Sequence, residues 1–481
     1  MKVSISNHSG RQLVAMSAIL LFPFPAHAAA EVVVFNGASL GLWWVIPFAG
    51  ILLSIAILPL ATPQFWHHHF GKVSLAWALA FLLPFAAVHG FGLTFHELLH
   101  TLLLEYIPFI ILLLALFTVS GGIYVRGNLH GSPGLNTALL ALGTMLASIM
   151  GTTGAAMLLI RPLIRANDNR RHNVHVVVFF IFLVGNIGGS LTPLGDPPLF
   201  LGFLKGIDFF WTTRAMLLPM LFASSILLAL FYVIDYYYYH HGGEERPARL
   251  DPTPDNQFGI EGRINFLLLG AVIACVLLSG FWKSNVSIGI LGIPVDLQGI
   301  VRDVLLLCIV ALSWKFTSKK VREANAYSWG PILEVAKLFI GIFITIIPAI
   351  AILRAGSQGA LAPLVALVSG PGGEPNNAMY FWLSGVLSSF LDNAPTYLVF
   401  FNLAGGDPAT LMTSLSATLL AISCGAVFMG ANTYIGNAPN FMIKAIAEDR
   451  GIRMPSFFGY MAWSGAILLP LFAVMTFVFF R

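Results

Sequence analysis

Charged residues are what this sequence has least of. Asp, Glu, Lys and Arg make up only 10% of its 481 residues, whereas a soluble domain carries about 25%. Hydrophobic residues make up 57%, so the composition excludes an ordinary soluble protein. The net charge of +4 gives no sign of a nucleic-acid partner. We therefore expect an integral membrane protein surrounded by the lipid bilayer.

Cysteine is scarce as well. Cys275, Cys308 and Cys424 each lie alone in an apolar run, whereas disulfide frameworks and metal sites need grouped cysteines at short spacings. We interpret the three as small core residues. The sequence predicts no bound cofactor.

Residues 1–28 resemble a secretory signal peptide. Lys2 and Arg11 precede the apolar run "LVAMSAILLFPF", and "AHA" at positions 26–28 offers small residues for cleavage. An uncleaved first helix is the alternative, but Pro23 and Pro25 make it a poor one. We expect cleavage near Ala28, a periplasmic mature N-terminus and a multi-pass protein in a bacterial inner membrane.

Many apolar runs approach or exceed the roughly 20 residues that a spanning helix needs. We expect spans near 41–62, 72–91, 101–125, 174–203, 212–235, 263–282, 302–316, 331–353, 408–443 and 457–480. Two further apolar pieces, 135–164 and 377–402, are each interrupted by a polar tip. Basic residues place loops 161–171, 319–322 and 444–453 in the cytoplasm. The number of crossings then agrees only if both interrupted pieces are re-entrant hairpins.

The architecture is predicted to occur twice. "GSLTPLGDPPLF" and "GANTYIGNAPNF" share five residues at a constant offset of 241 positions, which also aligns "LASIMGTTGAAML" with "LSSFLDNAPTYLV". The loops after the two hairpins differ in charge character, which predicts repeats inverted in the membrane. The expected fold is an all-α polytopic membrane protein. It comprises two inverted-topology repeats, each with a re-entrant hairpin and a discontinuous transmembrane helix, plus scaffold helices.

The predicted domains follow from these elements. Scaffold helices occupy 29–100 and 263–330, repeat 1 occupies 101–235, a cytoplasmic linker occupies 236–262, and repeat 2 occupies 331–481. The hairpin and the broken helix lie near 135–164 and 174–203 in repeat 1. They lie near 377–402 and 408–443 in repeat 2.

The helix breaks themselves indicate a transport site. Irregular backbone at membrane depth is tolerated only where it lines protein or a watery cavity, and inverted repeats with broken helices are typical of secondary transporters. Prolines remove backbone donors in "GSLTPLGDPPLF". This leaves carbonyls, with the Ser190 and Thr192 hydroxyls, free for a ligand.

Two carboxylates characterise the expected site. Asp392 lies at the second hairpin tip and Asp196 just beyond the first break, and neither tips nor breaks contain Lys or Arg. Oxygen ligands without cations suit a hard cation such as Na⁺ and suit a carboxylate substrate poorly. Because a buried carboxylate also binds protons, competition at Asp392 predicts exchange. The alternative for Asp392 is a role as a helix cap, and the alternative for Asp196 is a turn or cap role. The amides and threonines of the tips and breaks could instead form interhelical hydrogen bonds.

At these motifs the chain resembles the NhaD family of bacterial sodium/proton antiporters, within the ion transporter superfamily. The strings are "GTTGAAMLLIRPLIRAN", "GNIGGSLTPLGDPPLFLGF", "LDNAPTYLVF" and "GANTYIGNAPNFMIKAIAE". The resemblance implies a transport domain, a scaffold domain, a homodimer, and Na⁺ or Li⁺ efflux in exchange for H⁺. It implies a cation site built from Thr152, Thr153, Asp392 and Asn393 at the tips and from Ser190, Thr192, Asp196, Asn432, Thr433 and Asn437 at the breaks.

Two alternatives stay open. Carboxylate carriers of the same superfamily carry Ser-Asn-Thr at the tips, where this chain has Gly-Thr-Thr and Asp-Asn-Ala. The departure argues against a dicarboxylate, but a Na⁺-coupled carrier of another organic or inorganic anion would keep the fold. An intramembrane aspartyl protease would use Asp196 in "PLGD" with Asp235 as its partner. Pro193 stands where such an enzyme has glycine, so we do not expect an enzyme.

Overall fold

The computed structural model describes residues 36–127, 129–241, 259–370 and 372–481. The predicted signal peptide and most of the predicted linker lie outside the described residues. Helices dominate, and the strands in the described ranges form two short antiparallel pairs. β1 (Tyr124–Arg126) pairs with β2 (Gly259–Glu261), and β3 (Ser287–Ile290) pairs with β4 (Ile293–Asp296).

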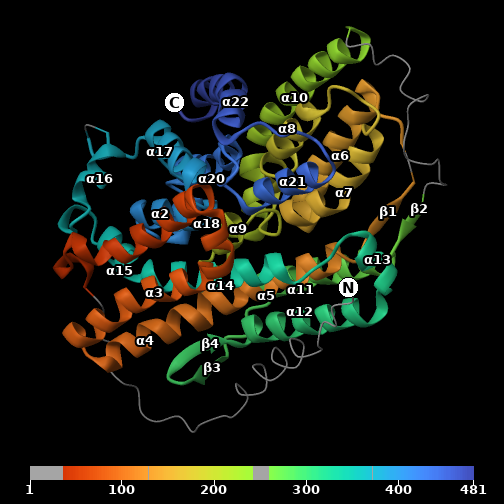
Figure 1. Cartoon of the computed structure of the whole chain (residues 1–481). Helices are drawn as coiled ribbons and strands as arrows, with labels where there is room; N and C mark the ends of the chain where they lie inside the picture. The colour runs from red at the N-terminus through yellow and green to blue at the C-terminus, as the bar shows by residue number, and fades with distance from the viewer. Residues whose placement is uncertain (1–35, 128, 242–258, 371) are drawn as a thin grey trace.

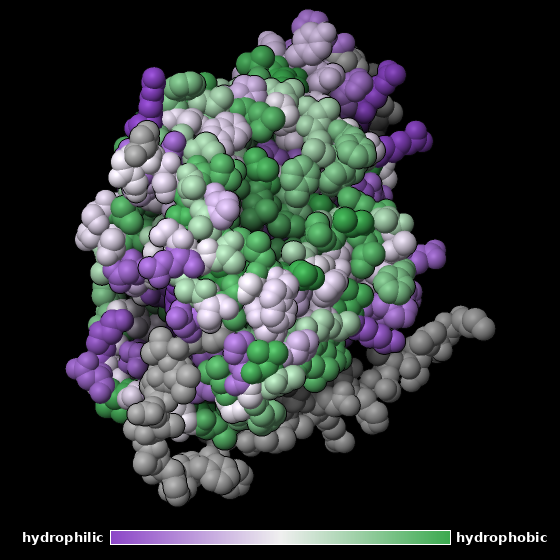
Figure 2. Space-filling model, turned by 90° about the vertical axis from the view of Figure 1, so that its left-hand side faces the viewer, coloured by the Kyte–Doolittle hydropathy of each residue, from purple (hydrophilic) through white to green (hydrophobic). Residues whose placement is uncertain are grey.

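Helices long enough to cross a membrane account for most of the chain. Within the described residues, nine helices have the length and hydropathy of a span, or up to ten if the bent pair α14 (Gly330–Thr345) and α15 (Ile347–Arg354) is one span. Large apolar side chains such as Leu83, Leu218 and Phe458 are exposed, and Figure 2 shows a broad hydrophobic face with hydrophilic residues toward its margins. A soluble protein would bury such a surface. The chain is an all-helical multi-pass membrane protein.

One group of helices lies in the lower half of Figure 1. It includes α3 (Pro63–His89), α4 (Phe91–Thr101), α5 (Ile107–Ser120), α11 (Ile264–Phe281), α12 (Leu297–Phe316) and α14. Helix α3 packs against α14 and against α2 (Ile46–Ala61), while α11 and α12 pack against each other and against α5. This group covers most of the segments that the sequence assigns to the scaffold, together with the helices that begin each predicted repeat.

The upper half contains the two helical hairpins (Figure 1). In the first, α6 (Pro133–Met150) and α7 (Thr152–Ala166) are joined at Gly151, whose φ of +81° favours glycine. In the second, α17 (Asn377–Phe390) and α18 (Asn393–Leu403) are joined through Asp392, which caps α18. Helix α6 by itself has the length of a span, although the sequence predicts it as one arm of a hairpin.

Both predicted helix breaks are present. In the first, α8 (Val174–Leu183) leads through a 3₁₀ turn (Ile187–Leu191) to α9 (Pro197–Leu204). In the second, α20 (Ser416–Phe428) leads through a 3₁₀ turn (Met429–Asn432) to α21 (Ala438–Asp449). Thr192 and Thr433 both adopt extended backbone conformations immediately after these turns. The two interruptions therefore have the same local geometry.

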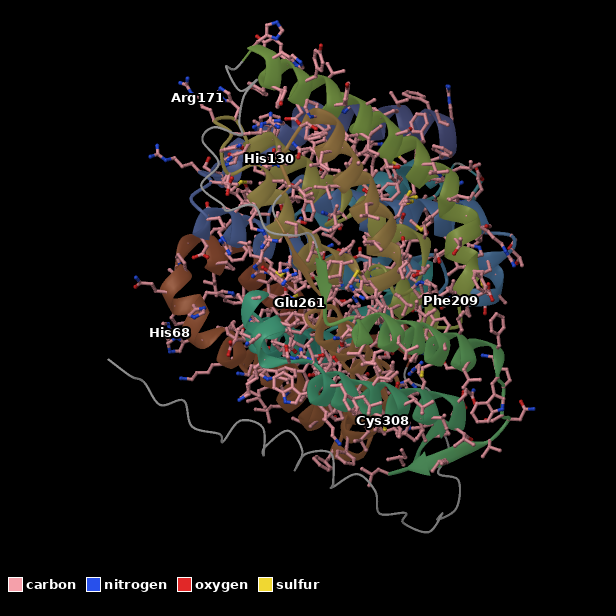
Figure 3. All side chains as sticks on the ribbon, turned by 90° about the vertical axis from the view of Figure 1, so that its right-hand side faces the viewer. His68, His130, Arg171, Phe209, Glu261 and Cys308 are labelled. Carbon is pink, nitrogen blue, oxygen red and sulfur yellow. The ribbon has the colours of Figure 1, made fainter. Side chains whose placement is uncertain are left out.

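The remaining helices connect these parts. They are α10 (Phe209–His241), α13 (Lys319–Ala324), α16 (Ala362–Leu367), α19 (Pro408–Met412) and α22 (Phe457–Phe479). His68, His130 and Arg171 lie toward one edge of the molecule and Phe209 toward the opposite edge (Figure 3). This agrees with the alternation of chain direction that the basic loops predict.

Several predicted helix boundaries were wrong. Helix α3 begins at Pro63 and not near position 72, so His67, His68 and His69 lie on the helix; proline is well suited to the first helical position. The span expected to start at 101 is continuous from Phe91 to Ser120, with a one-turn π-helix at Leu102–Tyr106. The segment expected as one span over 408–443 has a further interruption between α19 and α20.

Candidate functional site

Asp196 is the point at which both hairpins and both breaks meet. Its side chain is 1% exposed and accepts hydrogen bonds from Asn393 Nδ2 at 2.7 Å, Asn437 Nδ2 at 3.3 Å and Thr152 Oγ1 at 3.4 Å. Asp196 belongs to the first break, Asn437 to the second, and Thr152 and Asn393 to the two tips. Every donor is electrically neutral.

Four helix N-termini surround this carboxylate. Helices α7 and α18 begin at Thr152 and Asn393, while Asp196 and Asn437 are the N-cap residues of α9 and α21. Neither N-cap side chain bonds its own helix. An α-helix presents unpaired N–H groups and a partial positive charge at this end. The site therefore combines a carboxylate with backbone groups that favour anions.

Asp392 lines the cavity beside this cluster. The cavity has a volume of about 590 Å³ and is lined by Thr152, Thr153, Asp196, Asp392 and Asn437. Its opposite wall is largely apolar and comes from α2, α3, α5 and α14, including Leu116, Phe339 and Glu334. One Asp392 oxygen, Oδ1, accepts from the Ala394 N–H at 3.1 Å, so the capping role is present. That contact does not involve Oδ2.

A shared hydrogen-bonding frame holds both breaks against their hairpins. Ser148 donates to the Gly188 carbonyl and Thr192 to the Ser148 carbonyl. Ser389 and Thr433 make the corresponding bonds to Met429 and Ser389, 241 positions later. The N–H groups of Leu194 and Ile435 donate to these same threonine hydroxyls. Thr192 and Thr433 thus use their protons to hold the unwound backbone in place.

Close glycine contacts tighten the same two loops. An added Cβ at Gly195 would lie 2.1 Å from the Gly189 carbonyl oxygen, and one at Gly436 would lie 2.5 Å from that of Gly430. No side chain fits at these distances. The glycines that "GGSLTPLG" and "GANTYIG" share therefore have a steric reason to be there.

The other predicted site residues lie farther from Asp196 in the hydrogen-bond network. Ser190 is buried and donates to the Ile187 carbonyl. Thr153 lines the cavity. Asn432 donates to Ser389 Oγ at 2.9 Å, and its buried Oδ1, like Asn393 Oδ1, accepts no hydrogen bond among the described residues. The membership of all ten residues in a cation site stays a prediction.

Two asparagines that the sequence did not single out complete the network. Asn186 donates to Asn440 Oδ1 at 2.8 Å and accepts from Asn437 Nδ2 at 3.3 Å. Asn440 donates in turn to the carbonyls of Gly430 and Thr433. At the 241-residue offset Asn186 corresponds to Val427 and Asn440 to Leu199, so the repeat does not pair these asparagines. Their presence in "GNIGG" and "NAPNF", next to the breaks, was the available signal.

The residues considered for a protease do not form a pair. Asp235 accepts hydrogen bonds from His175 at 2.7 Å and from Asn136 at 3.0 Å, and it forms an ion pair with Arg170 at 2.7 Å. The hydrogen-bond partners of Asp196 are Thr152, Asn393 and Asn437. The two carboxylates belong to separate networks, which gives no aspartyl dyad.

Comparison with known proteins places the chain in a family. Residues 37–480 match the family profile CitMHS_2, described as "Putative citrate transport". No curated protein matches the sequence. The matched range includes both hairpins, both breaks and the cavity wall, and with them every residue around Asp196. The chain belongs to this citrate transport family, within the ion transporter superfamily, and is a membrane transporter.

Proposed function

We propose that this protein is a secondary active transporter that carries a polycarboxylate anion of the citrate class together with Na⁺ or H⁺ across the bacterial inner membrane. The observation that carries the proposal is the surroundings of Asp196. The carboxylate is 1% exposed, and its hydrogen-bond donors come from neutral groups on three other helix ends.

The need for a cation follows from charge balance. An isolated carboxylate at membrane depth is costly, by about 2.5–3.5 kcal/mol or more, and the described residues place no Lys or Arg in hydrogen-bonding contact with Asp196 or Asp392. An anionic substrate would add further negative charge. Na⁺ or H⁺ ions bound beside these two aspartates would offset the negative charge of the aspartates and of the substrate. The anion and the cations would therefore move together.

The attraction for an anion comes from the backbone. The N-termini of α7, α9, α18 and α21 surround the site, and such ends bind carboxylates in transporters with broken helices. A cavity of about 590 Å³ lies within the range of roughly 300–1,000 Å³ for small-molecule sites. The family match favours this anion carrier over the Na⁺/H⁺ exchanger as the main function.

We further propose that the halves are inverted repeats that act as one transport unit against a scaffold. The paired hydrogen bonds of Thr192 and Thr433, 241 positions apart, support the repeat. The cavity between the hairpins and α2, α3, α5 and α14 supports a boundary at that surface. The predicted domain limits and the homodimer stay predictions.

Na⁺/H⁺ exchange is the second candidate. The specific observation in its favour is the pair of aspartates, Asp196 and Asp392, beside the Thr152 hydroxyl and the Asn393 and Asn437 amides. This composition suits a hard cation without any anion. It also accounts for the resemblance to the NhaD antiporters.

Flux through purified protein in liposomes distinguishes the two functions. Labelled citrate uptake is measured with an inward Na⁺ gradient, with an inward H⁺ gradient and with neither. We expect uptake above protein-free liposomes only when a cation gradient is present. Uptake that is equally fast without either gradient would contradict cation coupling.

The matched measurement omits the anion. Liposomes with an internal pH indicator receive Na⁺, Li⁺ or K⁺ while citrate is absent. Dissipation of the pH gradient by Na⁺, together with no citrate uptake in the first experiment, would replace the anion carrier by the exchanger. The inhibition of labelled citrate uptake by unlabelled malate or succinate then measures the preference among carboxylates.

A further inference from the structure

A second pocket lies at the other end of α9 from Asp196. It has a volume of about 510 Å³ and lies among the α9–α10 turn, the end of α11, β4 and the start of α12. Phe209, which lines it, lies at the edge opposite His68, His130 and Arg171 (Figure 3). The basic loops assign that opposite edge to the cytoplasm, so the pocket belongs to the outer face.

Arg302 is the most deeply placed charge in this outer pocket. The residue is 6% exposed, and its Nε donates to Asp303 Oδ1 at 2.8 Å. Among the described residues this is its only hydrogen bond, so the two Nη groups have no protein acceptor there. A guanidinium with a free edge matches a carboxylate, which it binds through two parallel hydrogen bonds.

Phe200 lies between Arg302 and the central cavity. The Arg302 guanidinium carbon lies 5.8 Å from the centre of the Phe200 ring, and Phe200 itself lines the central cavity with Asp196. The ring belongs to α9, whose N-cap is Asp196. A single aromatic side chain therefore contacts the outer arginine on one side and the substrate cavity on another.

Lys205 and Lys283 add positive charge to the same pocket. Lys205 follows the last residue of α9 and forms an ion pair with Glu105 in the π-helical turn before α5. Lys283 is exposed.

Each acidic residue of the pocket accepts a hydrogen bond. Asp303 accepts from Arg302, whereas Asp296 and Asp208 accept from neutral donors, Gln298 and the Phe210 N–H, and keep their charge. Of the cationic groups that line this pocket, the Nη groups of Arg302 and the Lys283 ammonium have no hydrogen-bond partner among the described residues.

We propose that this outer pocket is a binding site for a carboxylate anion, with Arg302 as its anchor and Phe200 as the partition between it and the central cavity. The inference rests on the proposed function and adds to it the place where an anionic substrate binds before it reaches Asp196. No Lys or Arg is among the residues that line the central cavity. The outer pocket supplies Arg302, Lys205 and Lys283.

A cysteine reporter tests anion binding without requiring transport. Gly299 lines the pocket, and a Cβ added there meets no atom within 4 Å, so Gly299→Cys fits. In a background with Cys275, Cys308 and Cys424 replaced by Ser, an impermeant maleimide labels the introduced thiol of the full-length protein from outside. We expect citrate with Na⁺ to slow labelling severalfold when Arg302 is present. We expect no slowing in Arg302→Gln.

The sidedness of transport gives a second readout. Loss of a charge-assisted bidentate contact should raise the citrate concentration for half-maximal uptake from the outer face by about tenfold or more. The same constant measured from the cytoplasmic face should stay within about twofold in Arg302→Gln. Equal increases from both faces, or unchanged citrate protection of the introduced thiol, would overturn the inference.

Matched variants keep the test decisive. Lys315→Gln removes one positive charge from an exposed position at the other end of α12 and should leave labelling protection intact. If Arg302→Gln does not fold, Arg302→Lys, which loses the planar fork, replaces it with the same expectations. If citrate protects the introduced thiol but is not transported, the outer site is supported and the proposed transport function is contradicted. If citrate is transported but gives no protection, the transport function is supported and the outer site is contradicted.

Discussion

The two helix breaks share one frame and differ in the residue that faces the cavity. In both, a serine of the hairpin and a threonine after the 3₁₀ turn bond corresponding backbone carbonyls: Ser148 with Thr192, and Ser389 with Thr433. At the N-cap of the following helix, however, the first half has Asp196 and the second half has Asn437. The amide of one donates to the carboxylate of the other.

At the hairpin tips the carboxylate lies in the second half, whereas at the breaks it lies in the first. Gly151 precedes α7 in the first half, while Asp392 occupies the matching position before α18 in the second. Each half therefore contributes one carboxylate, from its break in one case and from its tip in the other. The shared residues are those that hold unwound backbone, and the unshared ones carry charge. Substitutions that make the halves more alike test which of these roles each residue has.

Asp196→Asn removes the difference between the two breaks and should have the largest effect. We expect transport to fall at least about a hundredfold, because charge-assisted hydrogen bonds contribute about 1.5–3 kcal/mol each and the cation would lose its charged ligand. Initial rates of labelled citrate uptake in liposomes measure the loss, with equal amounts of folded protein verified by gel filtration. A variant that keeps half of its activity would separate Asp196 from the transport site.

Asp392→Asn removes the charge from the second tip and should act on the cation. Asparagine caps helices about as well as aspartate, so α18 keeps its N-terminus. We expect the Na⁺ concentration for half-maximal transport to rise about tenfold, since a charged oxygen ligand becomes neutral. If cation titrations of citrate uptake, or of pH dissipation, coincide with those of the unmodified protein, Asp392 has the capping role alone.

Thr192→Val and Thr433→Val test the shared frame. Each removes one buried hydroxyl bond to the hairpin backbone, and we expect each to lower the free energy of unfolding by about 1 kcal/mol. Thermal unfolding in detergent measures both, and the two shifts should be similar. Thr137→Val is the control, because its hydroxyl donates to the Pro133 carbonyl within the same helix. A large shift in one half alone would show that the frames are not equivalent.

Asp407→Asn should have the smallest effect. Asp407 is an exposed N-cap of α19, and its side chain accepts from the Thr410 N–H at 2.8 Å. Because asparagine is also a good N-cap, uptake rates should change less than about twofold. A strong loss of uptake in this variant would mean that removing any acidic residue impairs the protein, and the Asp196 result would lose its specificity.

The helix breaks and tips could be predicted because their signals are local. Glycine and proline inside an apolar run disrupt a helix wherever it lies, and the 241-residue offset made the two disruptions comparable. The partners of the charged residues could not be predicted in this way. Glu105, for example, is 8% exposed and paired with Lys205. The two residues are far apart in the sequence, and only packing brings them together.

The preferred substrate was the least accurate expectation. The absence of Lys and Arg from the tips and breaks favoured a bare cation, whereas the family match favours an anion carrier. Four helix N-termini surround Asp196 and supply the positive potential that the side chains of the tips and breaks lack. The residue types in a sequence do not show where backbone dipoles point. Their effect depends on which helix ends converge.

The sequence by itself determined that this chain lies in a membrane and that two of its helices unwind there, because hydropathy and helix-breaking residues act over a few turns. Only the tertiary structure decided that Asp196 accepts hydrogen bonds from Asn393 and Asn437 of the other half. It also decided that the Arg302 guanidinium lies against the Phe200 ring with its Nη groups unpaired among the described residues. Those contacts join residues about a hundred or more positions apart. Hydrogen bonds and ring contacts depend on distances of a few ångströms, which no local pattern of residue types specifies.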